Sequence, residues 1–161
     1  MRRHQEAGRS EEVAREEVVS RTAPSPSGGS GRASSIKKKL VGRWRLVSYL
    51  ASPEQGEAVY PLGAAAKGVL DYSPEGNVSV HIMGAGYFAY YGYYSVDEKA
   101  ATVTHHLELC SDHSLAGASN LRHVALEGAR LVLSGSMNLD GRPHTIRVVW
   151  ERQAEPATDR R

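Results

Sequence analysis

Cysteine is almost absent from this chain, since Cys110 is the only one among 161 residues. A single thiol cannot form an intrachain disulfide and has no cysteine partners for a zinc cluster, so disulfide-stapled folds and Cys-rich metal modules are excluded. No hydrophobic run approaches the roughly 18 residues of a membrane-spanning helix, and we expect no membrane insertion. The N-terminal sequence MRRHQEAGRSEEVAREE is charged where a secretory signal needs its apolar core, so we expect a cytoplasmic protein.

Most of the chain has no excess of positive charge. Residues 1–39 contain 9 Lys and Arg against 5 Asp and Glu, whereas residues 40–161 contain 11 against 13. Binding to nucleic-acid phosphates generally needs a basic face on the folded domain itself. We therefore expect no nucleic-acid partner.

The composition changes twice along the chain. Residues 22–35, TAPSPSGGSGRASS, are rich in Pro, Gly and Ser and are typical of a flexible linker. The segment before it, SEEVAREEVVSR, has a helix-like pattern, but so short a helix is marginal on its own. We predict a disordered or weakly helical tail and linker over residues 1–35, one folded domain over 36–153, and a disordered C-terminal tail over 154–161.

From residue 40 onward, apolar and polar residues alternate with the period of two that is typical of β-strands. The segments 67–83 and 119–136 each contain a turn sequence, SPEG or EGAR, between two alternating runs, which predicts a β-hairpin. The whole pattern indicates about eight strands with short connections. Because closure removes the two exposed edges of such a sheet, we predict an all-β, eight-stranded, antiparallel up-and-down barrel.

Six motifs occur in a fixed order between residues 40 and 152: LVGRWRLVSY, GVLDYSPEGNVSVHIM, AYYGYYSVD, VTHHLEL, LRHVALEGARLVLS and VVWER. In these motifs the chain resembles the bacterial lipocalin-like domain family of the calycin type. The resemblance implies a lipocalin-like barrel over residues 36–153, in which Trp44 closes one end and Arg152 packs on Trp44. It also implies an open mouth, because a longer insert of the family is reduced here to GAGYF at residues 84–88.

Strand alternation assigns side chains to the two faces of the barrel wall. The apolar residues of the segment 102–110 place His105 and Leu109 inside the barrel and His106 and Cys110 outside. In the first strand, the same rule groups Ser48 with Trp44. The polar groups assigned to the interior are the predicted ligand-binding residues, namely Tyr72, Tyr90, Tyr94, His105 and Arg122.

Arg122 admits two interpretations. A buried guanidinium is costly without an anion or several acceptors, so Arg122, with His105 and the tyrosines, could receive the carboxylate, enolate or carbonyl of a mainly apolar ligand. In the other interpretation, Arg122 lies at the barrel rim with its stem buried and its head solvated, and the tyrosines are core aromatics bonded to backbone. The sequence leaves both open.

Two other kinds of site are disfavoured by the spacing of residues. His105 and His106 are neighbours on one strand and face opposite sides, so they cannot bind one metal ion together, and the orientation of His81 is ambiguous. The GAGYF segment is not followed by a helix, which argues against a nucleotide-binding loop, and no serine nucleophile elbow is present. We therefore expect no metal and no cofactor.

The predicted function is the binding of a small, mainly apolar molecule with a carbonyl or anionic end inside the barrel. The alternative is a cofactor-independent cyclase or isomerase acting on such a molecule in a natural-product pathway. In that case His105 would titrate near neutrality, Tyr90 or Tyr94 would donate to an oxygen, and Arg122 would stabilise negative charge. A structural or protein-interaction domain is a third possibility if side chains fill the barrel, and the oligomeric state is left open.

Overall fold

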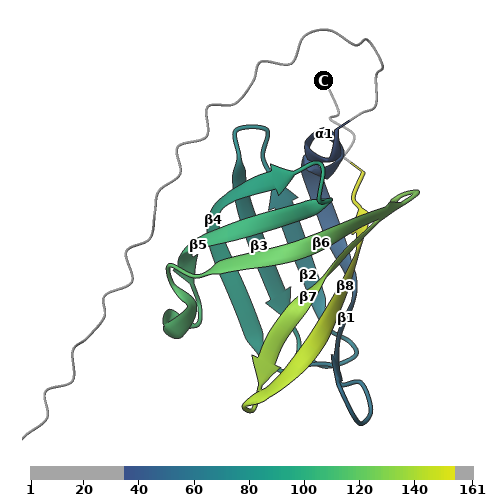
Figure 1. Ribbon diagram of the computed structural model, residues 1–161, viewed down its shortest axis with the longest axis vertical. Coiled ribbons are helices and arrows are strands. Elements are labelled where there is room, and N and C mark those ends of the chain that lie inside the picture. The colour runs from purple at the N-terminus through teal and green to yellow at the C-terminus, as the bar shows by residue number, and fades with distance from the viewer. Residues whose placement is uncertain (1–34, 155–161) are drawn as a thin grey trace, which may run out of the picture. The chain divides into compact units, whose positions relative to one another are not determined.

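The computed structural model describes residues 35–154. All but the last residue of the tail and linker predicted over 1–35, and all but the first residue of the tail predicted over 154–161, lie outside the described part. In chain order its elements are α1 (Ile36–Leu40), β1 (Gly42–Pro53), β2 (Lys67–Tyr72), β3 (Asn77–Met83), β4 (Tyr87–Asp97), β5 (Thr102–Cys110), η1 (His113–Leu115), β6 (Ser119–Glu127), β7 (Arg130–Leu139) and β8 (Arg142–Arg152). Each strand pairs antiparallel with the next, and β8 pairs with β1. The eight strands therefore close into a barrel, as predicted (Figure 1).

Both predicted hairpins are present. Strands β2 and β3 pair over six residues on each side of the SPEG turn, where the Gly76 amide donates to the Ser73 carbonyl at 3.2 Å. Strands β6 and β7 pair from Glu127 and Arg130 only as far as His123 and Ser134. Beyond that point the two strands separate, while β7 stays paired with β8 along its whole length.

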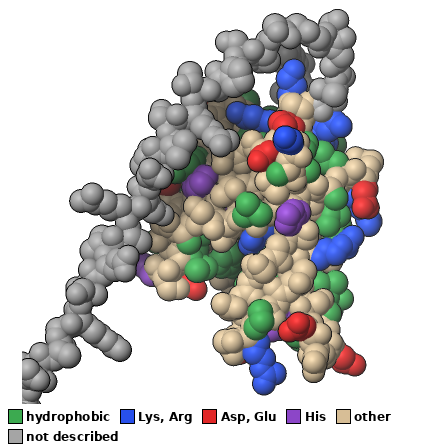
Figure 2. Space-filling view, in the orientation of Figure 1, with side chains coloured by type: hydrophobic (Ala, Val, Ile, Leu, Met, Phe, Trp, Pro, Cys, Tyr) green, Lys and Arg blue, Asp and Glu red, His purple; other side chains and the backbone are tan. Residues whose placement is uncertain are grey.

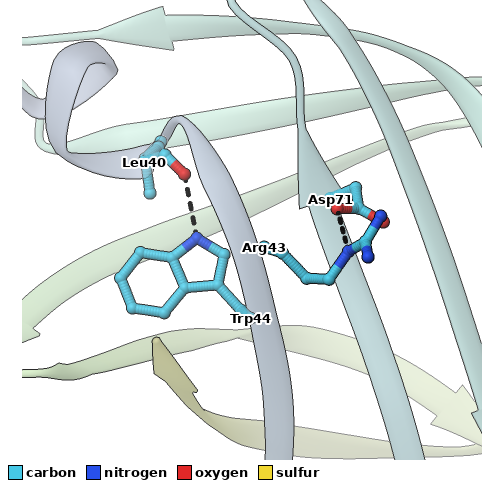
Figure 3. A network of polar contacts seen from close by, with 4 residues as sticks. All are labelled: Leu40, Arg43, Trp44 and Asp71. Atoms are coloured by element: carbon cyan, nitrogen blue, oxygen red, sulfur yellow. Dashed lines mark hydrogen bonds and ion pairs between the residues drawn. The ribbon is translucent and has the colours of Figure 1, made fainter. Parts of the chain in front are cut away.

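One end of the barrel is closed by α1 and the first tryptophan. The Trp44 side chain is 1% exposed, and its indole Nε1 donates to the Leu40 carbonyl at 2.8 Å (Figure 3). The guanidinium of Arg152 lies 4.1 Å from the Trp44 ring centroid and donates to the carbonyls of Val41 and Lys39. This is the cation–π pairing implied by the family resemblance. On the outer face beside it, Arg43 and Asp71 form an exposed ion pair (Figure 3).

Two β-bulges change the faces assigned by alternation. In β5, Leu109 pairs with Tyr91 and Leu107 with Gly92, so Glu108 is an extra residue. The prediction that Leu109 lies inside is therefore wrong: it is 67% exposed, while Cys110, half-buried, now shares the inner face with its partner Tyr90. Only glycine fits at position 92, because a Cβ there would lie 1.8 Å from the His106 carbonyl oxygen.

The second bulge lies in β1. Leu46 pairs with Trp150 and Ser48 with Val149, which leaves Val47 without a partner. The alternation shifts by one residue after this point, so Tyr49, not Ser48, pairs with a residue of the inner face, Val148. The grouping of Ser48 with Trp44 was wrong for this reason.

The outer face of β4, β5 and β6 carries exposed apolar side chains among mainly uncharged ones (Figure 2). They include Tyr91, Tyr93, Leu109 and Leu121. His106 is also on this face, as predicted, stacked on the Tyr93 ring with centroids 4.5 Å apart. Within residues 35–154, neither α1 nor η1 exceeds five residues, so no helix there is long enough to cross a membrane.

Candidate functional site

The barrel encloses a cavity of about 760 Å³. Apolar side chains from four strands, β2, β3, β7 and β8, form much of its wall: Leu70, Val80, Ile82, Leu133, Ile146 and Val148. The lining continues to Leu62, in the loop between β1 and β2, and to Asp112 and Ser114, which are exposed between β5 and β6. The cavity therefore opens at the end opposite Trp44, and its size suits one small ligand.

At the mouth of the cavity, the GAGYF segment begins with a tight turn. Residues 84–86 form a tight turn in which the Gly84 amide donates to the Gly86 carbonyl at 2.8 Å. The Ala85 amide donates to the Leu62 carbonyl, also at 2.8 Å, which holds this turn against the loop between β1 and β2.

A hydrogen-bonded group of three side chains joins the barrel core to the cavity. His105, on β5, is 1% exposed and lies between two tyrosines. Its Nε2 is 2.6 Å from the hydroxyl oxygen of Tyr72, and its Nδ1 is 2.7 Å from that of Tyr90. His105 and Tyr90 line the cavity, whereas Tyr72, 2% exposed, lies behind His105 and is not part of the lining.

Burial keeps all three side chains uncharged. Loss of hydration, reinforced by the positive charge of Arg122 and by His106, lowers the pKa of His105 to about 3. Loss of hydration likewise raises the pKa of the Tyr90 and Tyr72 hydroxyls above the usual 10.0. The expectation that His105 titrates near neutrality is therefore wrong, because its ring is neutral at that pH.

Tyr94 is inside the barrel, but it faces the closed end. Its hydroxyl donates to the Ser73 carbonyl at 2.8 Å, and its ring meets that of Tyr72 edge-on, with centroids 4.8 Å apart. Tyr94 does not line the cavity. Of the five predicted residues, Tyr90, His105 and Arg122 therefore line the cavity, whereas Tyr72 and Tyr94 lie outside its lining, in contact with each other.

Arg122 lies in the barrel wall where β6 and β7 separate. It pairs with the buried Val103 of β5, so its side chain leaves the strand on the inner face, as predicted. Arg122 lines both the cavity and a second hollow of about 490 Å³ between β6 and β7. Gly135 makes room for it, because a Cβ there would lie 3.0 Å from the Arg122 Nη1. That Nη1 donates to the Leu121 carbonyl at 2.9 Å.

The sequence reasoning missed further polar residues of the cavity, among them Tyr49 and Trp150. Tyr49, brought inward by the β1 bulge, has its hydroxyl 3.2 Å from the sulfur of Met137. Trp150, on β8, is 2% exposed, and its buried indole Nε1 has no hydrogen-bond partner within residues 35–154. The VVWER motif gave Trp150 an alternating position, but alternation cannot show that a donor is left without an acceptor.

The remaining histidine in question, His81, points outward. It is exposed on β3, with its Nδ1 3.2 Å from the Tyr87 hydroxyl oxygen. His81 and His105 are therefore on opposite faces of the wall and cannot share a metal ion. Between residues 35 and 154, no three His, Cys, Asp or Glu side chains converge as metal ligands would.

The sequence model of a lipocalin-like domain family matches residues 41–86 and 83–153. The chain belongs to this family. The match covers every strand of the barrel, and a barrel of this kind can hold a small ligand in its interior. A comparison with curated proteins finds no match.

Several solved structures are similar to this lipocalin-like chain. Lipoprotein YedD from Klebsiella pneumoniae is 13% identical with a TM-score of 0.41, over 85% of this chain and 81% of that one. An uncharacterized protein from Bacteroides eggerthii is 17% identical with a TM-score of 0.43, over 71% and 99%. The siderocalin Ex-FABP, described as having dual ligand specificities, is 13% identical with a TM-score of 0.33, over 74% and 78%.

Proposed function

We propose that the barrel binds one small, mainly apolar molecule that carries a carbonyl or anionic oxygen, and that Arg122 and Tyr90 receive this oxygen. The observation that carries the proposal is the half-buried Arg122, the one arginine of the described residues in the lining of a cavity whose deeper wall is mainly apolar. A guanidinium has five N–H donors, and the Arg122 side chain makes one hydrogen bond within residues 35–154, to the Leu121 carbonyl. An anionic or carbonyl oxygen in the cavity would supply the missing acceptors.

The other polar groups of the interior support the same ligand chemistry. Tyr90 presents a neutral hydroxyl, and Trp150 presents an N–H that finds no acceptor in the described part of the chain. The acidic side chain of the lining, Asp112, is at the exposed mouth, where its carboxylate already accepts hydrogen bonds from Ser114. An oxygen acceptor on the ligand therefore matches the cavity better than a donor does.

The alternative function, a cyclase or isomerase without a cofactor, loses its proposed base. With a pKa of about 3 and both ring nitrogens within hydrogen-bond distance of tyrosine hydroxyls, His105 has no free site to take a proton from a substrate at neutral pH. Binding needs no such titrating group. For this reason we propose binding rather than catalysis. We also propose that the barrel binds its ligand in the cytoplasm.

Two fluorescent dyes of similar shape and different charge test the role of Arg122. Anilinonaphthalene sulfonate is an anion, and N-phenylnaphthylamine lacks the sulfonate. Arg122→Leu keeps the bulk and removes the charge, so we expect it to weaken the anionic dye by about 1.5–3 kcal/mol, the range for a hydrogen bond to a charged group. The neutral dye should bind as before.

The matched control is Arg147→Leu, which removes an exposed arginine from the outer face of β8. It should change the affinity of neither dye. Equal weakening of both dyes by Arg122→Leu would mean that Arg122 only supports the wall, and would overturn the proposal. A separate experiment, native mass spectrometry of the purified chain, detects a ligand that is carried through purification and gives the mass of the natural molecule.

A further inference from the structure

The group Tyr72, His105 and Tyr90 has only one arrangement of hydrogens that satisfies the buried hydroxyl of Tyr72. Tyr72 is 2% exposed. Within residues 35–154, the one hydrogen-bond partner of its hydroxyl is Nε2 of His105. If Nε2 carried a proton, it would donate to the Tyr72 oxygen, and the Tyr72 hydroxyl proton would then have no acceptor. A buried donor left in that state costs about 1–3 kcal/mol.

The Tyr72 hydroxyl therefore donates to Nε2, which must be unprotonated. Since a neutral imidazole carries one N–H, the proton of His105 is on Nδ1. That N–H donates across 2.7 Å to the oxygen of Tyr90. The Tyr90 oxygen is thus already an acceptor, and its own hydroxyl proton is not used within the group.

We propose that Tyr72 and His105 are positioning residues that fix the Tyr90 hydroxyl as a hydrogen-bond donor to the ligand, so that the ligand's oxygen is held by Tyr90 as well as by Arg122. Tyr90 is the member of the group that lines the cavity with its hydroxyl free to donate. The second half of this inference rests on the proposed ligand-binding function, whereas the position of the proton on His105 does not.

Charged and titratable groups around His105 leave this arrangement stable near neutral pH. The groups acting on it are Tyr72 on β2, Tyr90 on β4, Arg122 on β6 and His106 on the opposite face of β5. Burial and the charge of Arg122 both disfavour a doubly protonated ring. The neutral form with hydrogen on Nδ1 should therefore persist well below neutrality.

The first test measures the proton directly, in the full chain without ligand. Nitrogen-15 NMR of protein labelled in its histidine rings distinguishes a protonated from an unprotonated ring nitrogen, and backbone correlations assign His105. We expect a hydrogen on Nδ1 and none on Nε2. A hydrogen on Nε2, or a charged ring at neutral pH, would overturn the inference, and neither result depends on whether any ligand binds.

The second test removes the Tyr72 hydroxyl. In Tyr72→Phe nothing fixes Nε2 as an acceptor, so His105 should become a mixture of its two neutral forms. In the form with hydrogen on Nε2, the Tyr90 hydroxyl donates to Nδ1 and is lost to the ligand. A Tyr72 side chain that only fills space would leave the single form unchanged, and that result would refute its positioning role. If the variant does not fold, the wild-type measurement still decides.

The third test links the proton to binding. The affinity of anilinonaphthalene sulfonate should fall roughly tenfold or more in Tyr90→Phe, as for one hydrogen bond to a charged group, while that of N-phenylnaphthylamine stays the same. In Tyr72→Phe the loss should equal the reciprocal of the fraction of His105 with hydrogen on Nδ1, about twofold for an even mixture. The control is Tyr91→Phe, on the exposed outer face.

The outcomes of these tests are separable. If neither dye enters the cavity, the proposed function fails while the NMR result stands. If both dyes bind and Tyr90→Phe weakens them equally or not at all, the donor role of Tyr90 is refuted while binding stands.

Discussion

The stability of the barrel should fall at mildly acidic pH because of His105. Its pKa is lowered from 6.5 to about 3 in the folded chain. The unfolded chain therefore takes up a proton near pH 6.5 that the folded chain refuses, and stability rises with pH wherever the unfolded state binds more protons. The contribution of this neutral histidine is complete above about pH 6.5 and is lost as the pH falls toward about 3.

The magnitude follows from the size of the shift. One pKa unit corresponds to about 1.36 kcal/mol, so at about pH 4.5, two units below the pKa of the unfolded chain, His105 alone should remove about 2.7 kcal/mol of unfolding free energy. That is a large part of the roughly 5–15 kcal/mol that stabilises a typical domain. Urea unfolding at a series of pH values measures it.

The comparison that isolates His105 uses the variant His105→Gln, whose amide can still lie between the two tyrosines but does not titrate. Its unfolding free energy should fall by about 2.7 kcal/mol less than that of the wild type over the same pH interval. The matched control, His81→Gln, changes an exposed histidine on the outer face of β3 that is not among the groups acting on His105, and should keep the wild-type pH dependence. Identical pH dependence in His105→Gln and the wild type would show that the ring is not held neutral, and the reasoning about its burial would be wrong.

Two further predictions concern the tryptophans. Trp44→Ala should lower the unfolding free energy by about 3–5 kcal/mol, as for other buried large aromatics. Arg152→Ala should lower it by less, because its exposed head group loses one stacking contact and partly solvated hydrogen bonds. Urea unfolding that ranked the two variants in the opposite order would contradict the closure of this end. In a proton–nitrogen NMR spectrum, the indole N–H signal of Trp150 should shift when anilinonaphthalene sulfonate is added. The Trp44 signal should not shift, because its N–H is already bonded to the Leu40 carbonyl. A shifted Trp44 signal with an unchanged Trp150 signal would place the dye outside the cavity.

The strands and their order could be predicted from the sequence because alternation and turn residues are local signals. The hairpin around SPEG and the inward position of His105 follow from a period of two within a few residues. The errors of face, at Leu109, Cys110 and Ser48, have one physical cause. A bulge adds a residue to one strand without changing its composition, so the sequence pattern continues while the faces are exchanged.

The sequence predicted which residues form the site better than it predicted the protonation state of His105. His105 and Tyr72 are 33 residues apart on strands that are not paired with each other, and their 2.6 Å contact depends on how the barrel closes. The sequence offered the ordinary pKa of histidine and hence a titrating residue. Only the surroundings of the ring, two hydroxyls, no water-exposed edge and a nearby guanidinium, show that it is neutral.

The same surroundings bear on whether the barrel interior is built for stability or for a ligand. A domain needing only a stable core would gain from apolar side chains at these positions, because donors without acceptors and unfilled space both reduce stability. This barrel instead keeps a cavity of about 760 Å³, a half-buried guanidinium at Arg122 and an indole N–H at Trp150 that has no partner among the described residues 35–154. Local features that cost stability are expected at functional sites. The cost disappears if a molecule that brings an oxygen acceptor and apolar volume occupies the cavity, which is why the binding function accounts for the interior better than a purely structural role does.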